Sequence, residues 1–243
     1  MSVRVTGAVA ARVLTQLRRD PRTIALIVGV PCVLEALLKE IFAGRSQVFR
    51  HTGAPLLGLF PFVTMFLVTS ITMLRERTSG TLERLMTLPL AKLDLLAGYG
   101  AAFALVAAGQ AAVVSALTFG ALGLEVEGPR SLVAALAVAN AVLGTALGLF
   151  VSAFAQSEFQ AVQFMPATVF PQILLCGLFV PRGQMAGWLG GLSDALPLTY
   201  AYDALARTAA DEIDARFAVD AGVVCGCILL ALALGAATLR RRT

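Results

Sequence analysis

The chain has 243 residues, of which 58% are hydrophobic and 14% charged, and its formal net charge is +4. Soluble domains carry about 25% charged residues, so the composition excludes a disordered chain and a soluble domain, which could not bury so much apolar surface. The sequence therefore predicts an all-α, polytopic membrane protein.

The first segment, 1–20, is predicted to form an amphipathic helix that lies in the membrane interface. Apolar residues recur at every fourth position, at Val5, Val9, Val13 and Leu17. Arginines occupy other faces of the same helix, and an ordinary cytosolic helix is the alternative interpretation. Asp20 and Pro21 are expected to end it. The segment lacks a compact apolar region with a small-residue cleavage site, so we do not expect a cleavable signal.

Six apolar runs follow that approach or exceed the ~20 residues that a helix needs to cross a bilayer. They are Ile24–Ile41, Pro55–Leu74, Leu95–Leu124, Leu132–Ala155, Phe159–Val180 and Ala221–Leu239. No ten-residue alternation indicates a barrel, so all six are expected to be transmembrane helices. Six spans place both termini on one side, and that side has 12 cations against 7 on the other. This bias predicts cytoplasmic termini.

The loop between the second and third runs, 75–90, is predicted to contain a short helix. Ser79 or Gly80 can cap this helix, and Pro89 ends it. Its apolar face consists of Leu82, Leu85 and Met86. A capped helix of this kind suits a rigid peg that docks in a groove of a partner. A helix that simply lies on the lipid is the alternative.

The segment after the fifth run, 181–206, is divided by proline and glycine into pieces too short to span a bilayer. It holds the only tryptophan of the chain, Trp188, together with Tyr200 and Tyr202. These residue types are typical of a membrane interface. We expect short re-entrant or interfacial helices on the external side, and a plain external loop is the alternative.

These segments resemble a known family. Arg-Glu-Arg-Thr-Ser-Gly-Thr-Leu-Glu-Arg-Leu-Met-Thr-Leu-Pro-Leu (75–90) resembles the signature loop of type-2 ABC exporter (ABC-2) permeases. Gly-Leu-Phe-Val-Pro (177–181) and Leu-Pro-Leu-Thr-Tyr-Ala (196–201) resemble the C-terminal region of the same family. The resemblance covers nearly the whole chain, 1–243, as a single transmembrane domain. It is closest to the drug-resistance branch exemplified by daunorubicin exporters.

The resemblance implies that 75–90 is the coupling helix, which docks on a separate ATPase subunit. The residues that would carry this role are Glu76, Arg77, Gly80, Thr81, Leu82, Glu83, Arg84 and Pro89. ATP and magnesium would bind in the ATPase, and the sequence has no G-x-x-x-x-G-K-[ST] motif of its own. The family also implies a second permease chain, identical or related. We expect a non-enzymatic permease for hydrophobic or amphiphilic drugs or lipids in the bacterial inner membrane.

Polar residues and prolines inside the apolar runs are candidates for a substrate path or gate. They are Gln110, Asn140, Gln163, Pro166 and Pro171, with Trp188 in the external segment. Hydrogen bonding between helices, or structural irregularity, is the alternative. Gly144, Gly148 and Ser152 repeat at four-residue spacing, which predicts close helix packing within the chain or across a dimer.

Two other functions are weighed: an ion-gradient carrier and a membrane-embedded lipid-modifying enzyme. Glu35 is the one clear candidate for a proton relay, although its spacing from Lys39 favours a structural or snorkelling pair near the interface. An enzyme needs a nucleophile or an acid–base constellation. The only acidic cluster, Asp203, Asp211, Glu212 and Asp214, has no histidine or lysine neighbour in the sequence. No catalytic residue, metal ligand or nucleic-acid contact is expected.

Overall fold

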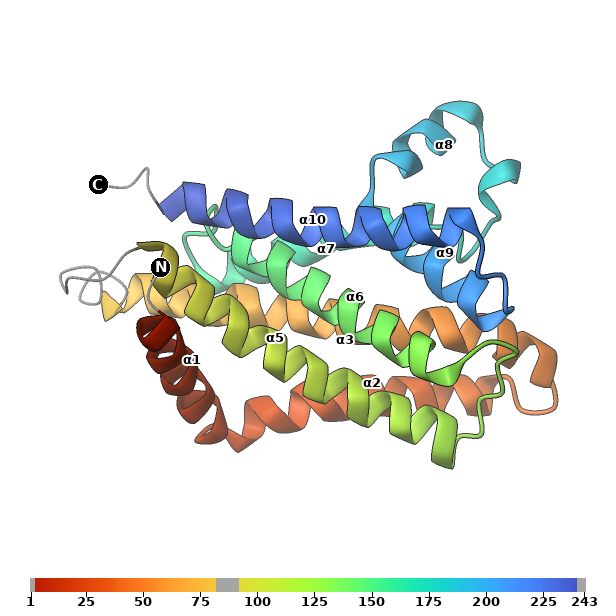
Figure 1. Ribbon diagram of the computed structural model, residues 1–243, viewed down its shortest axis with the longest axis horizontal. Coiled ribbons are helices and arrows are strands. Elements are labelled where there is room, and N and C mark those ends of the chain that lie inside the picture. Colours follow the sequence, from red (N-terminus) through yellow and green to blue (C-terminus); the bar gives the residue numbers. More distant parts are fainter. Residues whose placement is uncertain (1–2, 82–91, 240–243) are drawn as a thin grey trace.

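A computed structural model describes residues 3–81 and 92–239 (Figure 1). Every regular element in these two ranges is a helix. The helices are α1 (Val3–Arg18), α2 (Pro21–Ile41), α3 (Ser46–Thr78), α5 (Lys92–Ala116) with a π-helical turn η1 (Leu117–Ala121), α6 (Arg130–Val151), α7 (Glu158–Leu175), the short 3-10 turn η2 (Arg182–Gln184), α8 (Gly187–Asp194), α9 (Pro197–Ala209) and α10 (Ala215–Leu239). The prediction of an all-helical chain is thus confirmed for the described residues.

Each predicted apolar run forms a helix, but several boundaries differ from the prediction. Helix α3 begins at Ser46 rather than Pro55, α10 begins at Ala215 rather than Ala221, and α6 ends at Val151 rather than Ala155. Helix α3 continues to Thr78, so the first residues of the predicted 75–90 loop form its last turn. It ends where Gly80 adopts a φ of 70°, a conformation that glycine accepts without strain. Helix α7 ends at Leu175 rather than Val180, shortly before Gly177, whose φ is 103°.

Four helices among the described residues are long and apolar enough to cross a membrane, judged by length and composition. They cover Ser46–Thr78, Ala97–Ala121, Arg130–Val151 and Ala215–Thr238. The other two predicted spans are present as the helices α2 and α7. A total of six transmembrane helices therefore remains a prediction.

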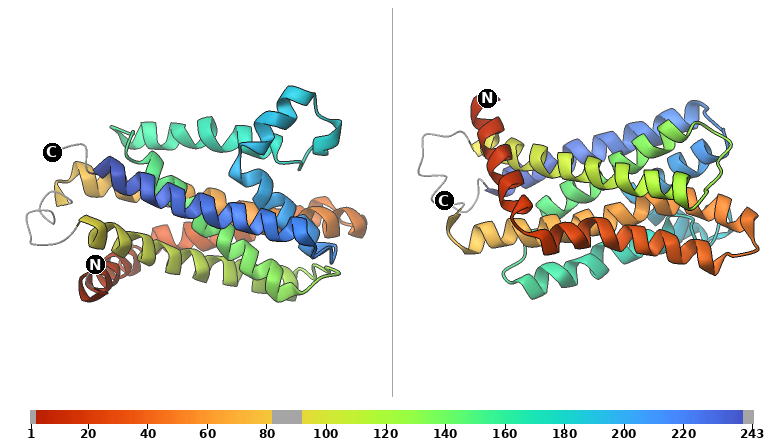
Figure 2. Two further views of the ribbon diagram at one scale, coloured as in Figure 1. Left: turned by 45° about the horizontal axis from the view of Figure 1, so that its top comes forward. Right: turned by 90° about the horizontal axis from the view of Figure 1, so that it is seen from below.

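The helices α2, α3, α5, α6, α7 and α10 run along the long axis of the molecule (Figures 1 and 2). Helix α1 crosses one end of this bundle, where α3 and α10 finish and α5 begins. Helix α8 lies at the opposite end. We call these the α1 end and the α8 end.

Helix α3 forms the centre of the bundle and contacts α2, α5, α6, α7 and α9. Its closest partner is α6, because glycines there leave no side chain between the two backbones. A Cβ atom on Gly144 would lie 2.2 Å from the carbonyl oxygen of Phe62, and one on Gly148 would lie 2.5 Å from that of Phe66. The predicted small-residue face is therefore a contact within the chain.

The apolar face of helix α1 packs against another helix of the same chain. Val9 and Val13 are buried against α5. A Cβ atom on Gly98 of α5 would lie 2.6 Å from Cβ of Val9. The helix predicted for 1–20 is thus formed, and its apolar stripe contacts a neighbouring helix. Its position in a membrane interface remains a prediction.

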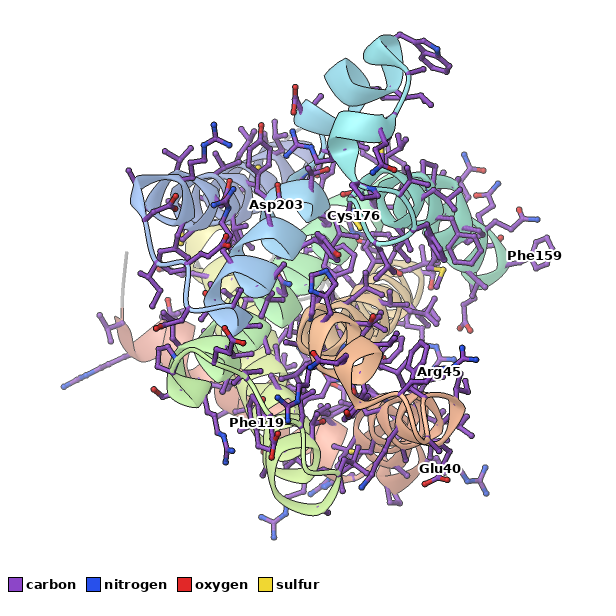
Figure 3. All side chains as sticks on the ribbon, turned by 90° about the vertical axis from the view of Figure 1, so that its right-hand side faces the viewer. Glu40, Arg45, Phe119, Phe159, Cys176 and Asp203 are labelled. Atoms are coloured by element: carbon purple, nitrogen blue, oxygen red, sulfur yellow. The ribbon has the colours of Figure 1, made fainter. Side chains whose placement is uncertain are left out.

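The segment 181–206 forms η2, α8 and most of α9. Helix α9 packs against the bundle helices α3, α6, α7 and α10. Helix α8 has fewer neighbours, and its main contacts are with α7, α9 and η2. Figure 3 views the bundle from this end, with Asp203 on α9. Short helices are present as predicted, and a re-entrant path through the membrane remains untested.

We predict that Gly144→Leu disrupts the bundle, because the new side chain meets the backbone of Phe62 rather than a movable side chain. Overpacking of this kind costs about 1–3 kcal/mol or more. The matched control is Gly226→Leu in α10, where a Cβ atom meets nothing within 4 Å. Size-exclusion profiles and thermal unfolding of the two purified variants test this. Equal stability of both would contradict a close α3–α6 contact.

Candidate functional site

The described part of the predicted coupling loop meets α1 and α5 at the α1 end. Arg12 of α1 donates hydrogen bonds from Nη2 to both carboxyl oxygens of Glu76, at 3.1 and 3.2 Å. Its Nη1 donates to the hydroxyl of Tyr99 on α5, at 3.2 Å. Three helices far apart in the sequence are therefore joined through one guanidinium group. We call Arg12, Glu76 and Tyr99 the arginine clamp.

The arginine clamp is largely shielded from solvent. The side chain of Glu76 is 5% exposed and that of Arg12 is 35% exposed, while Tyr99 is fully buried. Partial burial lowers the pKa of Arg12, but the attraction of Tyr99 and Glu76 outweighs burial and raises this pKa overall. The guanidinium therefore stays charged, and charge-assisted hydrogen bonds of this kind are the stronger ones.

A cavity of 310 Å³ adjoins the arginine clamp. Its lining comes from α1, α2, α3 and α5, and it includes Asp20, Thr23 and Phe103. Asp20 caps α2 by accepting hydrogen bonds from the backbone N–H and the hydroxyl of Thr23, and these bonds lower the pKa of Asp20. The sequence pattern Asp-Pro thus ends α1 and begins α2, as expected.

A second ion pair links α3 to α7 beside this cavity. Arg75 donates from Nε to Oε1 of Glu158 at 2.7 Å and from Nη2 to Oε2 at 2.9 Å. The hydrogen bonds from Arg75 lower the pKa of Glu158. Both side chains are more than half exposed, so this pair contributes little to stability.

The predicted coupling residues fall into three groups. Glu76 is buried in the arginine clamp, and Arg77 is half-buried. Gly80 and Thr81 lie just after α3, where the hydroxyl groups of Ser79 and Thr81 are 2.9 Å apart. The remaining four lie outside the described residues: Leu82, Glu83, Arg84 and Pro89.

The structure does not bring the predicted path or gate residues together. Asn140 is buried on α6 against Gly58 of α3. Three of them are exposed on α7: Gln163, Pro166 and Pro171. Trp188 is 73% exposed on α8. Phe159, also on α7, points away from the bundle in Figure 3. These residues do not line one cavity.

Gln110 has a structural partner in α2. Pro31 has no N–H, so the carbonyl of Ile27, four residues earlier, lacks its usual helical donor. Nε2 of Gln110 donates to this carbonyl at 2.6 Å. The side chain of one helix thus satisfies the backbone group that a proline frees in another.

Two arginines pair with several of the acidic residues at the α8 end. Arg182 binds Asp203 at 2.7 Å and also binds Asp194 of α8. Arg207 lies within 3.5 Å of Asp214 and Asp220. Burial raises the pKa of Asp203, while Arg182 opposes this effect. These ion pairs connect η2, α8, α9 and α10.

A cavity of 600 Å³ opens beside these ion pairs. It is lined by His51, Arg182, Asp194, Asp203 and Arg216, among others. No histidine lies near the acidic cluster in the sequence, but the fold places His51 at the same cavity. Within the described residues, no group of three or more His, Cys, Asp or Glu could hold a metal ion.

Sequence reasoning missed two members of the arginine clamp. Arg12 is 64 positions from Glu76 and 87 from Tyr99. The amphipathic pattern placed Arg12 on the polar face of α1, which is correct, but no local pattern relates this face to α3 or α5. The packing of α1 on α5, with Val9 against Gly98, brings Arg12 beside Tyr99.

Comparison with known proteins gives a family match. Residues 4–208 match the model of the ABC-2 type transporter family. ABC transporter G family member 20 of Dictyostelium discoideum is 25% identical over 173 residues, which are 71% of this chain and 24% of that protein. The probable multidrug ABC transporter permease YbhR of Escherichia coli K12 is 28% identical over 148 residues, 61% of this chain and 40% of the permease. The matched region thus spans well under half of either relative.

We predict that Glu76→Gln destabilises the chain by about 1–3 kcal/mol, because it weakens the hydrogen bonds of a mostly buried charged pair. The control is Glu158→Gln, which removes an exposed pair and should cost under about 1 kcal/mol. Unfolding of the purified variants by denaturant measures both. Equal losses would mean that the arginine clamp does not hold α1 to α3.

A double-mutant cycle tests the bond between Gln110 and Ile27. Gln110→Leu should cost about 1–3 kcal/mol, because the carbonyl of Ile27 loses its donor. In a Pro31→Ala background the cost should fall, since the N–H of the alanine can donate to that carbonyl. A cost that is the same in both backgrounds would refute this role of Gln110.

Proposed function

Since the chain belongs to the ABC-2 type transporter family, we propose that it is the permease subunit of an ATP-driven exporter. It would move hydrophobic or amphiphilic compounds across a bacterial inner membrane. ATP and magnesium would bind in a separate ATPase subunit, and a second permease chain, identical or related, would complete the path. The chain itself would perform no chemical reaction.

The observation that carries this proposal is the arginine clamp at the start of the 75–90 segment. Glu76 lies four residues before Gly80, where α3 ends. Through Arg12 and Tyr99, this last turn of α3 is tied to α1 and α5. A force applied to residues 80–89 would therefore reach three helices at once. A simple surface loop has no need of such a connection.

The proposed mechanism is a rigid-body movement. The ATPase closes on ATP and presses on residues 80–89, and the clamp transmits the displacement to α3, α1 and α5. Because α6 contacts α3 backbone to backbone, α6 would move with them. The path would open between this group of helices and the second permease chain.

The composition of the helices supports an apolar cargo. The sequence from Leu95 to Leu124, which includes most of α5, has no charged residue. A path with few fixed charges favours drugs or lipids over charged polysaccharides. The name of the Escherichia coli relative, a probable multidrug permease, agrees with this class. Membership of the daunorubicin-exporter branch is part of the proposal.

We propose six transmembrane helices, α2, α3, α5, α6, α7 and α10, with both termini in the cytoplasm. Helix α1 then lies at the cytoplasmic interface, and α8 lies outside. The arrangement in Figure 1 supports this, because α1 and the end of α10 are at the same end of the bundle. The excess of cations on that side agrees with the positive-inside rule.

The two other functions have less support. A lipid-modifying enzyme needs free acids or a nucleophile, but Asp203 and Asp214 are paired with arginines. A secondary carrier needs an intramembrane ionisable group that does work. Glu35 is such a group, but the family match and the clamp favour an exporter.

We predict that Glu83→Ala abolishes co-purification of the tagged chain with an ATPase subunit from native membranes and abolishes ATP-dependent efflux. The physical reason is loss of the docking contact at the coupling segment. Glu212→Ala, at the α8 end, is the control and should leave both unchanged. Full assembly and efflux in the Glu83 variant would remove the coupling role from this segment.

A further inference from the structure

Glu35 is fully buried in the half of α2 that follows Pro31. Within residues 3–81 and 92–239, neither of its carboxyl oxygens has a hydrogen-bond partner. The spacing from Lys39 predicts a structural or snorkelling pair, but the structure forms no direct bond between Lys39 and the carboxyl group of Glu35. A carboxyl group in this state needs another explanation.

A second polar group that lacks a partner among the described residues lies in the turn that packs on α2. Helices α2 and α5 run in the same direction (Figure 1), and Gln110 bonds Ile27 at one level of their contact. Glu35 lies eight residues after Ile27, and Thr118 lies eight residues after Gln110, in the π-helical turn η1 that packs on α2. Thr118 is fully buried, and its hydroxyl also has no partner. Unusual π-helical turns are frequent at functional sites.

Among the described residues, no cation bonds the carboxyl group of Glu35. Its own helix offers the half-buried Lys39 and the thiol of Cys32. Helix α3 carries Arg50, which is paired with Glu125, and His51, which lines the cavities at the α8 end. The charged residues of α5 are Lys92 and Asp94 in its first turn, and η1 has none. Tyr99 and Arg12 are engaged in the arginine clamp at the α1 end.

An ionised carboxylate without partners is strongly disfavoured inside a protein, so the group neutralises instead. We propose that Glu35 is a proton-binding site. It holds a proton while α2 packs as it does here, and it releases the proton when the half of α2 after Pro31 opens to water. This inference goes beyond the exporter function and does not depend on it.

The hinge for this opening is at Pro31. The proline removes one hydrogen bond of the helix ladder, and a single side chain, Gln110, replaces it. The segment after Pro31 can therefore move without breaking a continuous backbone ladder. Because ionised Glu35 is acceptable only in the open state, a rising pH shifts the population toward that state.

The first experiment detects the proton directly. Infrared spectra of the purified full chain in lipid nanodiscs at neutral pH should contain the C=O stretch of a protonated carboxylic acid that Glu35→Gln removes. Glu40→Gln is the matched control, because Glu40 is exposed on the same helix and points outward in Figure 3. A difference spectrum in which Glu35→Gln removes only a carboxylate band would overturn the proposal.

The second experiment detects the opening. Cys32, one turn before Glu35, is kept while the other three cysteines are changed to alanine. Its labelling by N-ethylmaleimide should rise with pH more steeply than in Glu35→Gln, by up to about tenfold per pH unit for one released proton. The Gln variant reports the ionisation of the thiol alone. Identical pH profiles would overturn the link between proton release and opening.

A variant that fails to fold does not remove the test. Glu35→Met fills the same space without a titratable group and replaces Glu35→Gln in both experiments if the glutamine variant is unstable. Neither readout involves an ATPase or a cargo. A failed proton site is therefore distinguishable from a failed exporter assignment.

Discussion

The contact on which the rest of the structure depends is the backbone-to-backbone approach of α6 to α3. Gly144 and Gly148 allow it, because any side chain at these positions would overlap the carbonyl groups of Phe62 or Phe66. In an apolar chain the hydrophobic effect does not distinguish lipid from neighbouring helices, so close van der Waals contact determines which helices associate. Once α3 and α6 are joined, α3 still presents surfaces to α2, α5, α7 and α9.

Because α3 is central, a displacement of its last turn would be passed to several neighbouring helices. Glu76 is part of this turn, and its bonds to Arg12 cross from the bundle to the helix that lies over its end. Tyr99 adds α5 to the same group. In the proposed exporter, the clamp makes the coupling segment part of a rigid unit. The exposed pair of Arg75 and Glu158 connects α7 to that unit much more weakly.

Buried polar groups in this molecule differ in how they are satisfied. Gln110 donates the hydrogen bond that the carbonyl of Ile27 lacks because of Pro31, and Arg182 and Arg207 pair with nearby carboxylates at the α8 end. Glu35 has no such partner. A buried carboxyl group without a hydrogen-bond partner is stable only in its neutral form. Helix α2 thus contains Pro31, whose missing hydrogen bond is replaced by Gln110, and one turn later Glu35, whose carboxyl group has no partner among the described residues.

The sequence by itself determined the helical class and the approximate position of every long helix, because runs of apolar residues and helix-breaking residues such as Pro21 act locally. It also determined the small-residue face at Gly144 and the loop that resembles the family signature. Only the tertiary structure decided that this face contacts α3 and that Arg12 and Tyr99 bond in one cluster with Glu76. It alone also decided that Gln110 donates a hydrogen bond to the carbonyl of Ile27, and that Glu35 forms no bond with Lys39. These relations join residues that are distant in sequence or depend on side-chain direction. Periodicity along one helix defines a face of that helix, but the partner of the face is set by packing in three dimensions.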